Sequence, residues 1–427
     1  MKKIFISTIL FSGILISCSK DHDSTPSAGN GHPLTAADQA QVVDNYATIL
    51  EAGYQDAYNA ALTMQSSIKT FIANPTEQGL TDAKTAWLAA REPYMQTEMA
   101  RFYGGPIDGD SGDVLLNSWP LDEGYIDYLV GDSHAYQPFN PPHDSLSGII
   151  NNPSINITED YLMGNNQLDG GTTNANGDNV DVSAGYHAIE FLLWGQDATP
   201  ASQKIPGQRS YKDYLTTADA TGPNGARRAE YIQIVTQLVV DNLKEMVDAW
   251  APNVSTNYRA SFEKDIPTAI SNIFLGIGSL AKGEMSGERM SVPLALHAQE
   301  QEHSCFSDNT HRDLWLDMQG IANAYNGTYV NTAGTTIGKS QYSLSAYVQG
   351  LNVADDKNMQ DLLSKAQASL KAIEDNEPFD WLIDSNNPSG NQIVATGVTA
   401  VGAVADGISA MAKDINLDFQ SVPEEND

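Results

Sequence analysis

The sequence predicts an all-α protein that consists of two helical-bundle domains with long irregular loop insertions. Apolar residues recur every three or four positions over several long segments, a periodicity typical of helices that bury one face. The chain has 427 residues, more than one hydrophobic core usually organises, so two domains are expected. The sequence lacks the alternation of strand and helix patterns that would build a parallel sheet.

The first two helices are predicted from a long apolar stripe and the breaks that follow it. Residues 35–72 form one helix, because Thr35 can cap its start and Pro75 follows its end. A second helix is predicted from Thr81 to Met99, before a Gly-Gly-Pro break. Two helices joined by a short turn indicate antiparallel neighbours in a bundle. The stripe of the first helix consists of Val43, Tyr46, Leu50, Tyr54, Ala57, Ala61, Met64, Ile68 and Phe71.

Residues 104–182 differ in kind, since they are dense in Gly, Asn, Asp and Pro. We expect a structured excursion from the bundle, because its aromatic residues need a buried environment. Within it, the spacing of Asn174, Asn176 and Asp178 is similar to a calcium loop. The glycine and the final glutamate of such a loop are missing from their places, so calcium is not expected there. The helix that follows is predicted to begin near Ser183, with Asp181 or Ser183 as its cap.

The second half of the chain repeats the helical pattern after Pro223. An apolar stripe runs to Trp250, and residues 325–345 are predicted to form a loop or a small hairpin. The boundary falls in the Pro- and Gly-containing stretch between about 200 and 222, which gives domains 34–205 and 206–427. Further helices are predicted over residues 255–281, 284–304, 356–375 and 391–415.

The N-terminus reads as the signal of a bacterial lipoprotein. Two lysines precede an apolar run, and residues 15–18 form a lipobox that ends in Cys18. We expect cleavage before Cys18, acylation of its thiol and attachment to a membrane, with residues 19–33 as a flexible tether. The expected location is the bacterial cell envelope, as an outer-membrane lipoprotein that faces the periplasm or is exposed at the surface. An ordinary cleaved signal is the alternative.

Composition limits the classes of partner. The formal net charge is −31, from 54 acidic and 23 basic residues, and such a surface repels nucleic acid. Nucleic acid is therefore not expected as a partner. Once Cys18 is acylated, Cys305 is the one remaining cysteine, so an internal disulfide is not available. Stability must then come from the hydrophobic core.

Gly185, His187 and Glu190 form a Gly-x-His-x-x-Glu pattern inside an apolar run. On a helix, side chains three positions apart share one face. An imidazole nitrogen and a carboxylate oxygen that converge in an apolar environment suit zinc or iron better than calcium. His187 and Glu190 are therefore candidate metal ligands. A structural His–Glu pair is the alternative.

Two ligands are too few, and the second half of the chain offers more within ten positions. Glu302, His303 and Asp308 are the further candidate ligands, with His303 first among them and His311 behind it. The alternative is local: residues 307–310 form a good turn, and Asp308 would then cap a helix that begins near His311.

Three motifs in order resemble the signature of the imelysin-like family, bacterial envelope proteins once classed as peptidases and now associated mainly with iron uptake. The Gly-x-His-x-x-Glu run is one, residues 117–125 with Trp119 form the Trp-Pro segment, and residues 301–313 form the third. The resemblance spans roughly residues 35 to 420. It implies a two-domain helical protein with its site near the domain junction.

The resemblance also implies what the site holds. Iron, or an iron-bearing chelate, would bind at the junction, and an envelope iron transporter is the possible protein partner. Trp119, Arg289 and Trp194 are the candidates for orienting the metal or for binding an organic group that it carries.

Three other functions stay open at this point. His187, Glu190 and His303 imitate the His-x-x-Glu…His order of zinc carboxypeptidases, with Glu302 as the available general base. That enzyme type needs an α/β sheet, and the helical zinc-protease motif His-Glu-x-x-His is absent from the sequence. We therefore favour metal binding over a zinc peptidase. Haem held by one histidine is a further alternative, and a partner-binding module with a vestigial site is the last.

Overall fold

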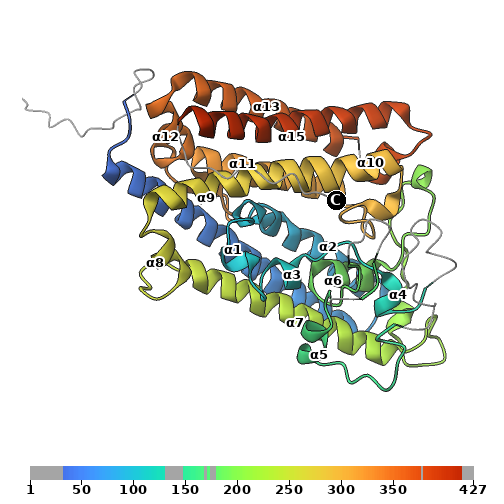
Figure 1. Cartoon of the computed structure of the whole chain (residues 1–427). Helices are drawn as coiled ribbons and strands as arrows, with labels where there is room; N and C mark the ends of the chain where they lie inside the picture. Colours follow the sequence, from blue (N-terminus) through green and yellow to red (C-terminus); the bar gives the residue numbers. More distant parts are fainter. Residues whose placement is uncertain (1–31, 130–147, 168–170, 174–178, 377, 416–427) are drawn as a thin grey trace, which may run out of the picture. The chain divides into compact units, whose positions relative to one another are not determined.

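The long apolar stripes of the sequence form helices throughout the part of the chain that the structure describes. This computed structural model describes residues 32–129, 148–167, 171–173, 179–376 and 378–415. In these residues the regular structure is helical apart from one two-stranded hairpin (Figure 1). The all-α prediction is confirmed. The lipidation candidate Cys18, the tether and the calcium-like residues 174–178 lie outside the described residues.

Helices α1 (Ala36–Ala73) and α2 (Glu77–Met95) pack against each other. Thr35 caps α1 as predicted, because its Oγ1 accepts from the backbone N of Asp38 at 3.2 Å. The predicted start of α2 at Thr81 was wrong. Helix α2 begins four residues earlier, at Glu77, and Thr76 caps it, since its Oγ1 accepts from the backbone N of Gly79 at 3.0 Å.

Helix α7 (Gly225–Trp250) lies alongside α1 and α6 (Gly185–Trp194), and its predicted stripe is buried. The predicted helix over 255–281 is two helices, α8 (Tyr258–Phe262) and α9 (Ile266–Ser279). Helix α8 ends at Glu263 as its C-cap, and Asp265 caps α9, because its carboxylate accepts from the backbone N of Thr268 at 3.3 Å.

The predicted helix over 284–304 was wrong in its second half. A π-helical segment, η6 (Leu280–Ser291), continues α9 and leads into α10 (Val292–Leu296). Helix α10 ends at His297, which adopts a left-handed backbone conformation with φ +51°. Residues 297–309 are then irregular apart from one 3₁₀ turn. His303 therefore lies on an irregular segment, which bends it back towards α6.

The C-terminal helices form a layer of their own in Figure 1, where α13 (Val353–Glu374) and α15 (Pro388–Asp414) lie side by side. Helix α11 (Thr310–Asn326) leads to the hairpin of β1 (Thr328–Val330) and β2 (Thr336–Gly338), which pair antiparallel. This confirms the predicted hairpin. The remaining C-terminal helices are α12 (Leu344–Leu351) and α14 (Phe379–Ile383).

Helix α15 is also long and apolar enough, by length and composition, to cross a membrane. One of its faces packs against α13, η6 and α9. Val394, Val401 and Ile408 on that face are fully buried. Of the apolar window of α15, 33% is buried by this packing.

The Gly- and Asn-rich stretch is a structured excursion, as predicted, and it carries α3 (Asp113–Leu116), α4 (Glu123–Ile126) and α5 (Glu159–Gly164). The predicted cap of the motif helix was wrong. Helix α6 begins after Ala184 without a side-chain cap, and Ser183 Oγ donates instead to the carbonyl of Leu162. Single 3₁₀ turns occur at Glu98–Ala100, Pro106–Asp108, Ala201–Gln203, Tyr211–Tyr214, Gln299–Gln301 and Ser340–Tyr342.

Helices from both halves of the sequence share one hydrophobic core. Helix α1 packs on α2 and also on α7, and α2 packs on α11. Residues Gly31–Asp427 form one compact unit. The division into domains 34–205 and 206–427 stays a prediction. The site is positioned by α6 and by the irregular segment before α11, which meet inside this core.

Candidate metal centre

The glycine of the motif fixes where α6 begins. Gly185 has φ +90°, and a Cβ on it would lie 2.7 Å from the carbonyl oxygen of Leu116. A side chain is excluded there by both backbone conformation and space. The first turn of α6 can therefore lie directly against the end of α3. This contact brings the start of α6 close to the backbone of Asn117, which follows α3.

The two motif side chains face each other, as their spacing predicts. His187 Nδ1 lies 2.8 Å from Glu190 Oε2. The other oxygen of Glu190 accepts from the backbone N and the Oγ of Ser307, at 2.9 and 2.7 Å. Both oxygens of Glu190 are thus engaged inside the protein. In this arrangement Glu190 orients the His187 ring, and a direct bond from Glu190 to an ion stays a prediction.

His303 lies opposite His187, 116 positions further along the chain. The two Nε2 atoms are 3.3 Å apart, and the ring planes are inclined by 67°. We call His187 and His303 the histidine pair. Asn117 Nδ2 lies 3.3 Å from the same Nε2 of His303. The structure therefore brings together His187, Glu190 and His303, three of the five ligands that the sequence predicts.

Asp313 supports His303 much as Glu190 supports His187. Its Oδ2 lies 3.3 Å from His303 Nδ1 and accepts from Ser304 Oγ at 2.6 Å. It also forms a fully buried ion pair with Arg91, at 2.7 Å. Burial alone would raise the pKa of Asp313, but Arg91 and His303 hold it far below its usual value. Asp313 is therefore an anion that lies behind the His303 ring, within reach of Nδ1.

Both imidazoles are neutral near pH 7. Burial lowers the pKa of His187 well below its usual value, and the charge of His303 would lower it further. Burial and Arg289 lower the pKa of His303 to about 4. Two imidazole nitrogens bonded to one zinc- or iron-sized ion at about 2.1 Å are separated by roughly 3 Å. The separation within the histidine pair fits that geometry.

The carboxylates behind the rings complete a recognised metal-binding arrangement. A metal-bound histidine usually donates its other ring N–H to a carboxylate, which fixes the tautomer and leaves a lone pair facing the ion. Glu190 behind His187 and Asp313 behind His303 occupy those places. Because burial raises the pKa of Glu190 to about 8, Glu190 must release its proton before it can accept from His187 Nδ1, and an ion at Nε2 would favour that release. The donor set therefore fits a metal ion between the two rings.

A pocket of about 230 Å³ opens beside His303. Trp119 forms part of its wall, with its ring edge-on to His303 at 5.7 Å between centroids and its Nε1 donating to the carbonyl of Glu302. Arg289 also lines it, so two of the three predicted ligand-orienting residues adjoin the histidine pair. The lining consists of Arg101, Asp113, Val114, Asn117, Ser118, Trp119, Gln167, Glu284, Arg289 and His303.

Arginines and carboxylates form a paired network around this pocket. Arg289 pairs with Glu98, Glu284 and Asp317, and Arg101 pairs with Glu98, Glu284 and Asp113. Burial raises the pKa of Asp113 to about 6 despite Arg101, and it raises the pKa of Asp317 well above its usual value. The charges of the network are therefore close to balanced.

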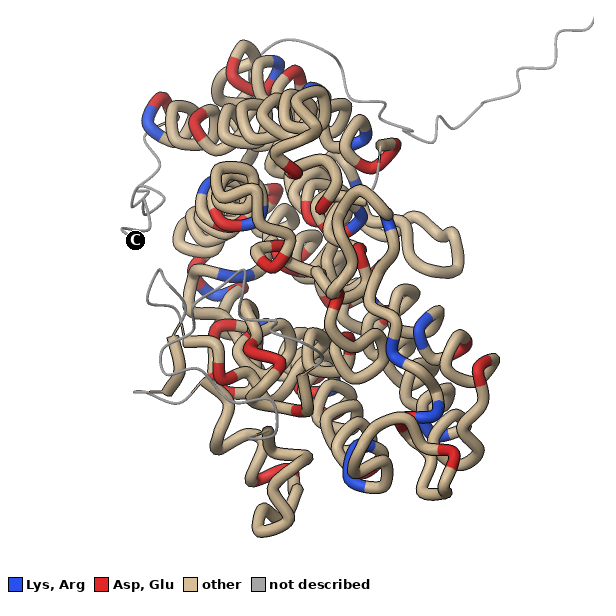
Figure 2. The backbone as a smooth tube through the Cα atoms, turned by 90° about the vertical axis from the view of Figure 1, so that its right-hand side faces the viewer, with Lys and Arg blue, Asp and Glu red and all other residues tan. Residues whose placement is uncertain are grey.

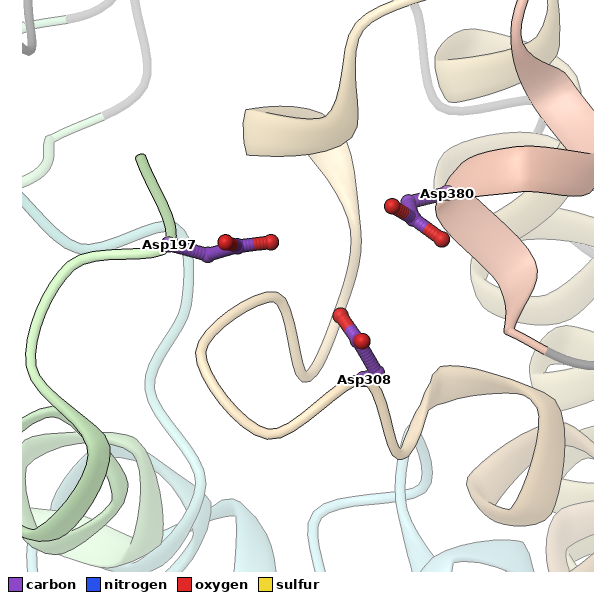
Figure 3. A group of neighbouring side chains, drawn as sticks. All are labelled: Asp197, Asp308 and Asp380. Carbon is purple, nitrogen blue, oxygen red and sulfur yellow. The ribbon is translucent and has the colours of Figure 1, made fainter. Parts of the chain in front are cut away.

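The remaining predicted site residues lie elsewhere. Trp194 packs against Trp87 at 5.3 Å between ring centroids, inside the core, and does not line the pocket beside His303. Asp308 lies beside Asp197 and Asp380 (Figure 3). Glu302 is fully buried, and burial followed by the charges of Asp380 and Asp308 raises its pKa.

The local interpretation of Asp308 was wrong. Helix α11 begins at Thr310 after Asn309, without a side-chain cap, so Asp308 does not cap it. His311 lies in the first turn of α11. Sequence reasoning also missed Asp313 and Asn117, although both stand inside the motif segments that carry the family resemblance. Nothing in the sequence distinguishes Asp380, which is one aspartate among many.

Asn117, His187 and His303, one residue from each of the three motifs, therefore lie together in the structure. The comparison with protein families gives the family that these motifs resemble. The family model for imelysin matches residues 50–407. The chain belongs to the imelysin family. In this imelysin, the match spans both halves of the chain and includes every residue of the histidine pair and its supporting carboxylates.

One similar protein has a name that refers to iron. Over 369 residues, this chain is 24% identical to the iron-regulated protein A of Synechococcus elongatus. The aligned residues cover 84% of this chain and 81% of that protein.

Solved structures show the same fold. A putative iron-regulated protein A precursor from Parabacteroides distasonis superposes with a TM-score of 0.66 at 18% identity, covering 90% of this chain and 97% of that one. An imelysin-like protein from Psychrobacter arcticum gives a TM-score of 0.54 at 12% identity, over 90% and 95% of the two chains.

Proposed function

We propose that this imelysin binds iron, or an iron-bearing ligand, at the histidine pair and acts in iron uptake as a lipid-anchored protein of the bacterial envelope. The observation that carries the proposal is the 3.3 Å separation of the His187 and His303 Nε2 atoms, each ring backed by a carboxylate. The similarity to a protein named for its regulation by iron supports the choice of metal.

The surroundings of the pair suit a cation that must be captured and later released. Two neutral nitrogens give an ion fewer protein bonds than a closed four-ligand site, which leaves positions for water or for a chelate. The negative net charge of the whole chain, formally −31, would draw cations towards the protein without adding a rigid bond. Trp119 and Arg289 are placed in the pocket wall to contact an organic group on the metal.

The first experiment is an anaerobic titration of the purified protein with Fe²⁺, followed by calorimetry and by metal analysis after desalting. We expect one ion per chain, and we expect His187→Ala and His303→Ala each to lose it. His297→Asn is the matched control, because His297 is an exposed histidine whose left-handed backbone conformation asparagine tolerates. Equal iron binding by wild type and both alanine variants would overturn the proposal.

The peptidase alternative is tested by adding zinc and peptide substrates to the same purified wild-type and variant proteins. Glu302, the predicted general base, is fully buried and does not line the pocket beside His303, so it is not positioned to activate a water there. We therefore expect the zinc-loaded protein to leave unstructured peptides intact. Peptide cleavage that depends on zinc and on His303 would instead favour the enzyme.

A further inference from the structure

A second group of potential ligands lies apart from the histidine pair. Asp197 follows α6, Asp308 precedes α11, and Asp380 belongs to α14. One carboxylate oxygen of each lies within 4.8 Å of the others, and the three side chains point towards a common space (Figure 3). We call these residues the aspartate cluster. All three are buried, with 5%, 7% and 2% of their surfaces exposed.

The hydrogen bonds of the aspartate cluster leave it short of positive charge. Asp197 accepts from the backbone N and the Oγ1 of Thr199, and Asp380 accepts from the backbone N of Trp381. These donors are neutral. Lys204 is the cation that lowers the pKa of Asp380, and its effect is smaller than those of burial and of the neighbouring acids, which raise that pKa to about 7.

Unpartnered oxygens point to a missing ligand. Asp308 Oδ1 is buried and has no hydrogen-bond partner, and Figure 3 shows its carboxylate directed between Asp197 and Asp380. Neither side-chain oxygen of Glu302 has a hydrogen-bond partner, although Glu302 is fully buried and its pKa is raised by burial and then by the charges of Asp380 and Asp308. Buried carboxylates without partners cost several kcal/mol unless a proton or a cation joins them.

Some other buried aspartates of this protein are paired with arginine. Asp127 forms ion pairs with Arg209 and Arg228, and Asp313 forms one with Arg91. Asp56 is buried with neutral donors instead, but its two oxygens accept from Tyr329 and Thr332. The described residues contain no such ion pair for any member of the aspartate cluster.

We propose that the aspartate cluster binds a hard divalent cation of the calcium class, with Glu302 beside it as a further carboxylate. Three carboxylate oxygens from separate segments, without nitrogen or sulfur donors, match the preference of such ions for oxygen ligands at 2.3–2.6 Å. The ion joins the end of α6, the segment before α11 and α14. It is a structural ion, because its ligands are buried and do not line the pocket beside His303.

The proposal does not depend on iron binding, but the two sites are linked through the chain. Asp308 directly follows Ser307, which donates twice to Glu190. An ion at the aspartate cluster would therefore hold the segment that also carries His303. Loss of the ion would loosen that segment first.

The test compares thermal unfolding of the purified, chelator-treated protein before and after Ca²⁺ is added, with Mg²⁺ and Mn²⁺ in parallel. We expect Ca²⁺ to raise the Tm by about 3 °C or more. In Asp308→Asn and Asp380→Asn this rise should vanish, while the Tm without metal stays at or above that of the wild type, because repulsion is relieved. Asp219→Asn is the control, since Asp219 is exposed, and it should respond like the wild type.

His303→Ala separates the two sites, because it should lose iron but keep the response to Ca²⁺. Calorimetry of the wild type with Ca²⁺ gives a readout that needs no variant. The absence of Ca²⁺, Mg²⁺ and Mn²⁺ binding by the wild type would overturn the proposal. So would a Ca²⁺ response that persists in both asparagine variants or disappears in His303→Ala alone.

Discussion

At the scale of single residues, the site depends on carboxylates that differ in what surrounds them. Asp313 is held as an anion by Arg91, whereas burial raises the pKa of Glu190 to about 8. Both stand behind a histidine whose pKa burial has lowered. The sequence identifies these residue types but not their charge states, because those follow from burial and from partners distant in the chain.

Glu190→Gln tests whether Glu190 acts by orienting His187. The amide can keep its oxygen towards Ser307, but its NH₂ group would then donate to His187 Nδ1 and force the proton onto Nε2, the atom that faces the ion. We expect iron affinity to fall by about 10- to 100-fold, with little change in Tm. Calorimetric titration beside thermal unfolding measures both. Unchanged affinity would exclude this role.

Glu123→Gln tests the effect of a buried acid on the pH dependence of stability. Burial, followed by the charge of Asp122, raises the pKa of Glu123 to about 8 from 4.5. The folded chain then keeps a proton that the unfolded chain loses, so stability falls as pH rises from 4.5 to 8. We expect the variant to gain about 4 kcal/mol relative to wild type at pH 8 and little at pH 4.5.

Urea unfolding of chelator-treated protein at the two pH values measures this difference, with Asp219→Asn as the exposed control. An equal change at both pH values would show that Glu123 keeps an ordinary pKa in the folded protein.

At the scale of elements, the site depends on where helices begin and end. Helix α6 starts at Gly185 against the end of α3, and α10 stops at His297 so that the following segment can bend back to α6. Hydrophobic periodicity predicts that helices exist but not these ends, because an end is decided by a single backbone conformation or a close contact.

Gly185→Ala tests the contact between α6 and α3. The added Cβ meets the Leu116 carbonyl oxygen at 2.7 Å at a residue with φ +90°, so α6 must shift. We expect a loss of about 2–4 kcal/mol in the free energy of unfolding and weaker iron binding. Gly164→Ala is the matched control, because a Cβ there meets nothing within 4 Å; its effect should stay within about 1 kcal/mol. Equal stability of the two variants would contradict this role for Gly185.

At the scale of the whole molecule, helices from both halves of the chain enclose the histidine pair. Acidic residues outnumber basic ones along most of the chain (Figure 2). This excess attracts cations towards the protein from a distance, while the selectivity comes from the buried nitrogens.

Cys18→Ser tests the membrane attachment proposed for the whole protein. Without a thiol to acylate, the protein should move from the membrane fraction to the soluble envelope fraction, because a lipid chain is the proposed anchor. Immunoblotting of cell fractions measures this, and iron binding by the released protein should be unchanged. Retention of the variant in membranes would exclude Cys18 as the anchor.

The sequence by itself determined the all-α class, the family and three residues of the histidine centre, His187, Glu190 and His303. The fold class follows from local periodicity, and the family and the three residues follow from short motifs. Both signals depend on residues that are close together in the sequence. It also grouped Asp308 and Glu302 with them, because all lie in one stretch of chain.

Tertiary structure alone decided which of these side chains meet. Residues 303 and 308 are close in sequence, yet the irregular segment directs one to His187 and the other to Asp197 and Asp380. The charges that surround a buried side chain belong to segments that are distant in the sequence. They come into contact only when the helices pack, so the sequence pattern does not show which side chains meet.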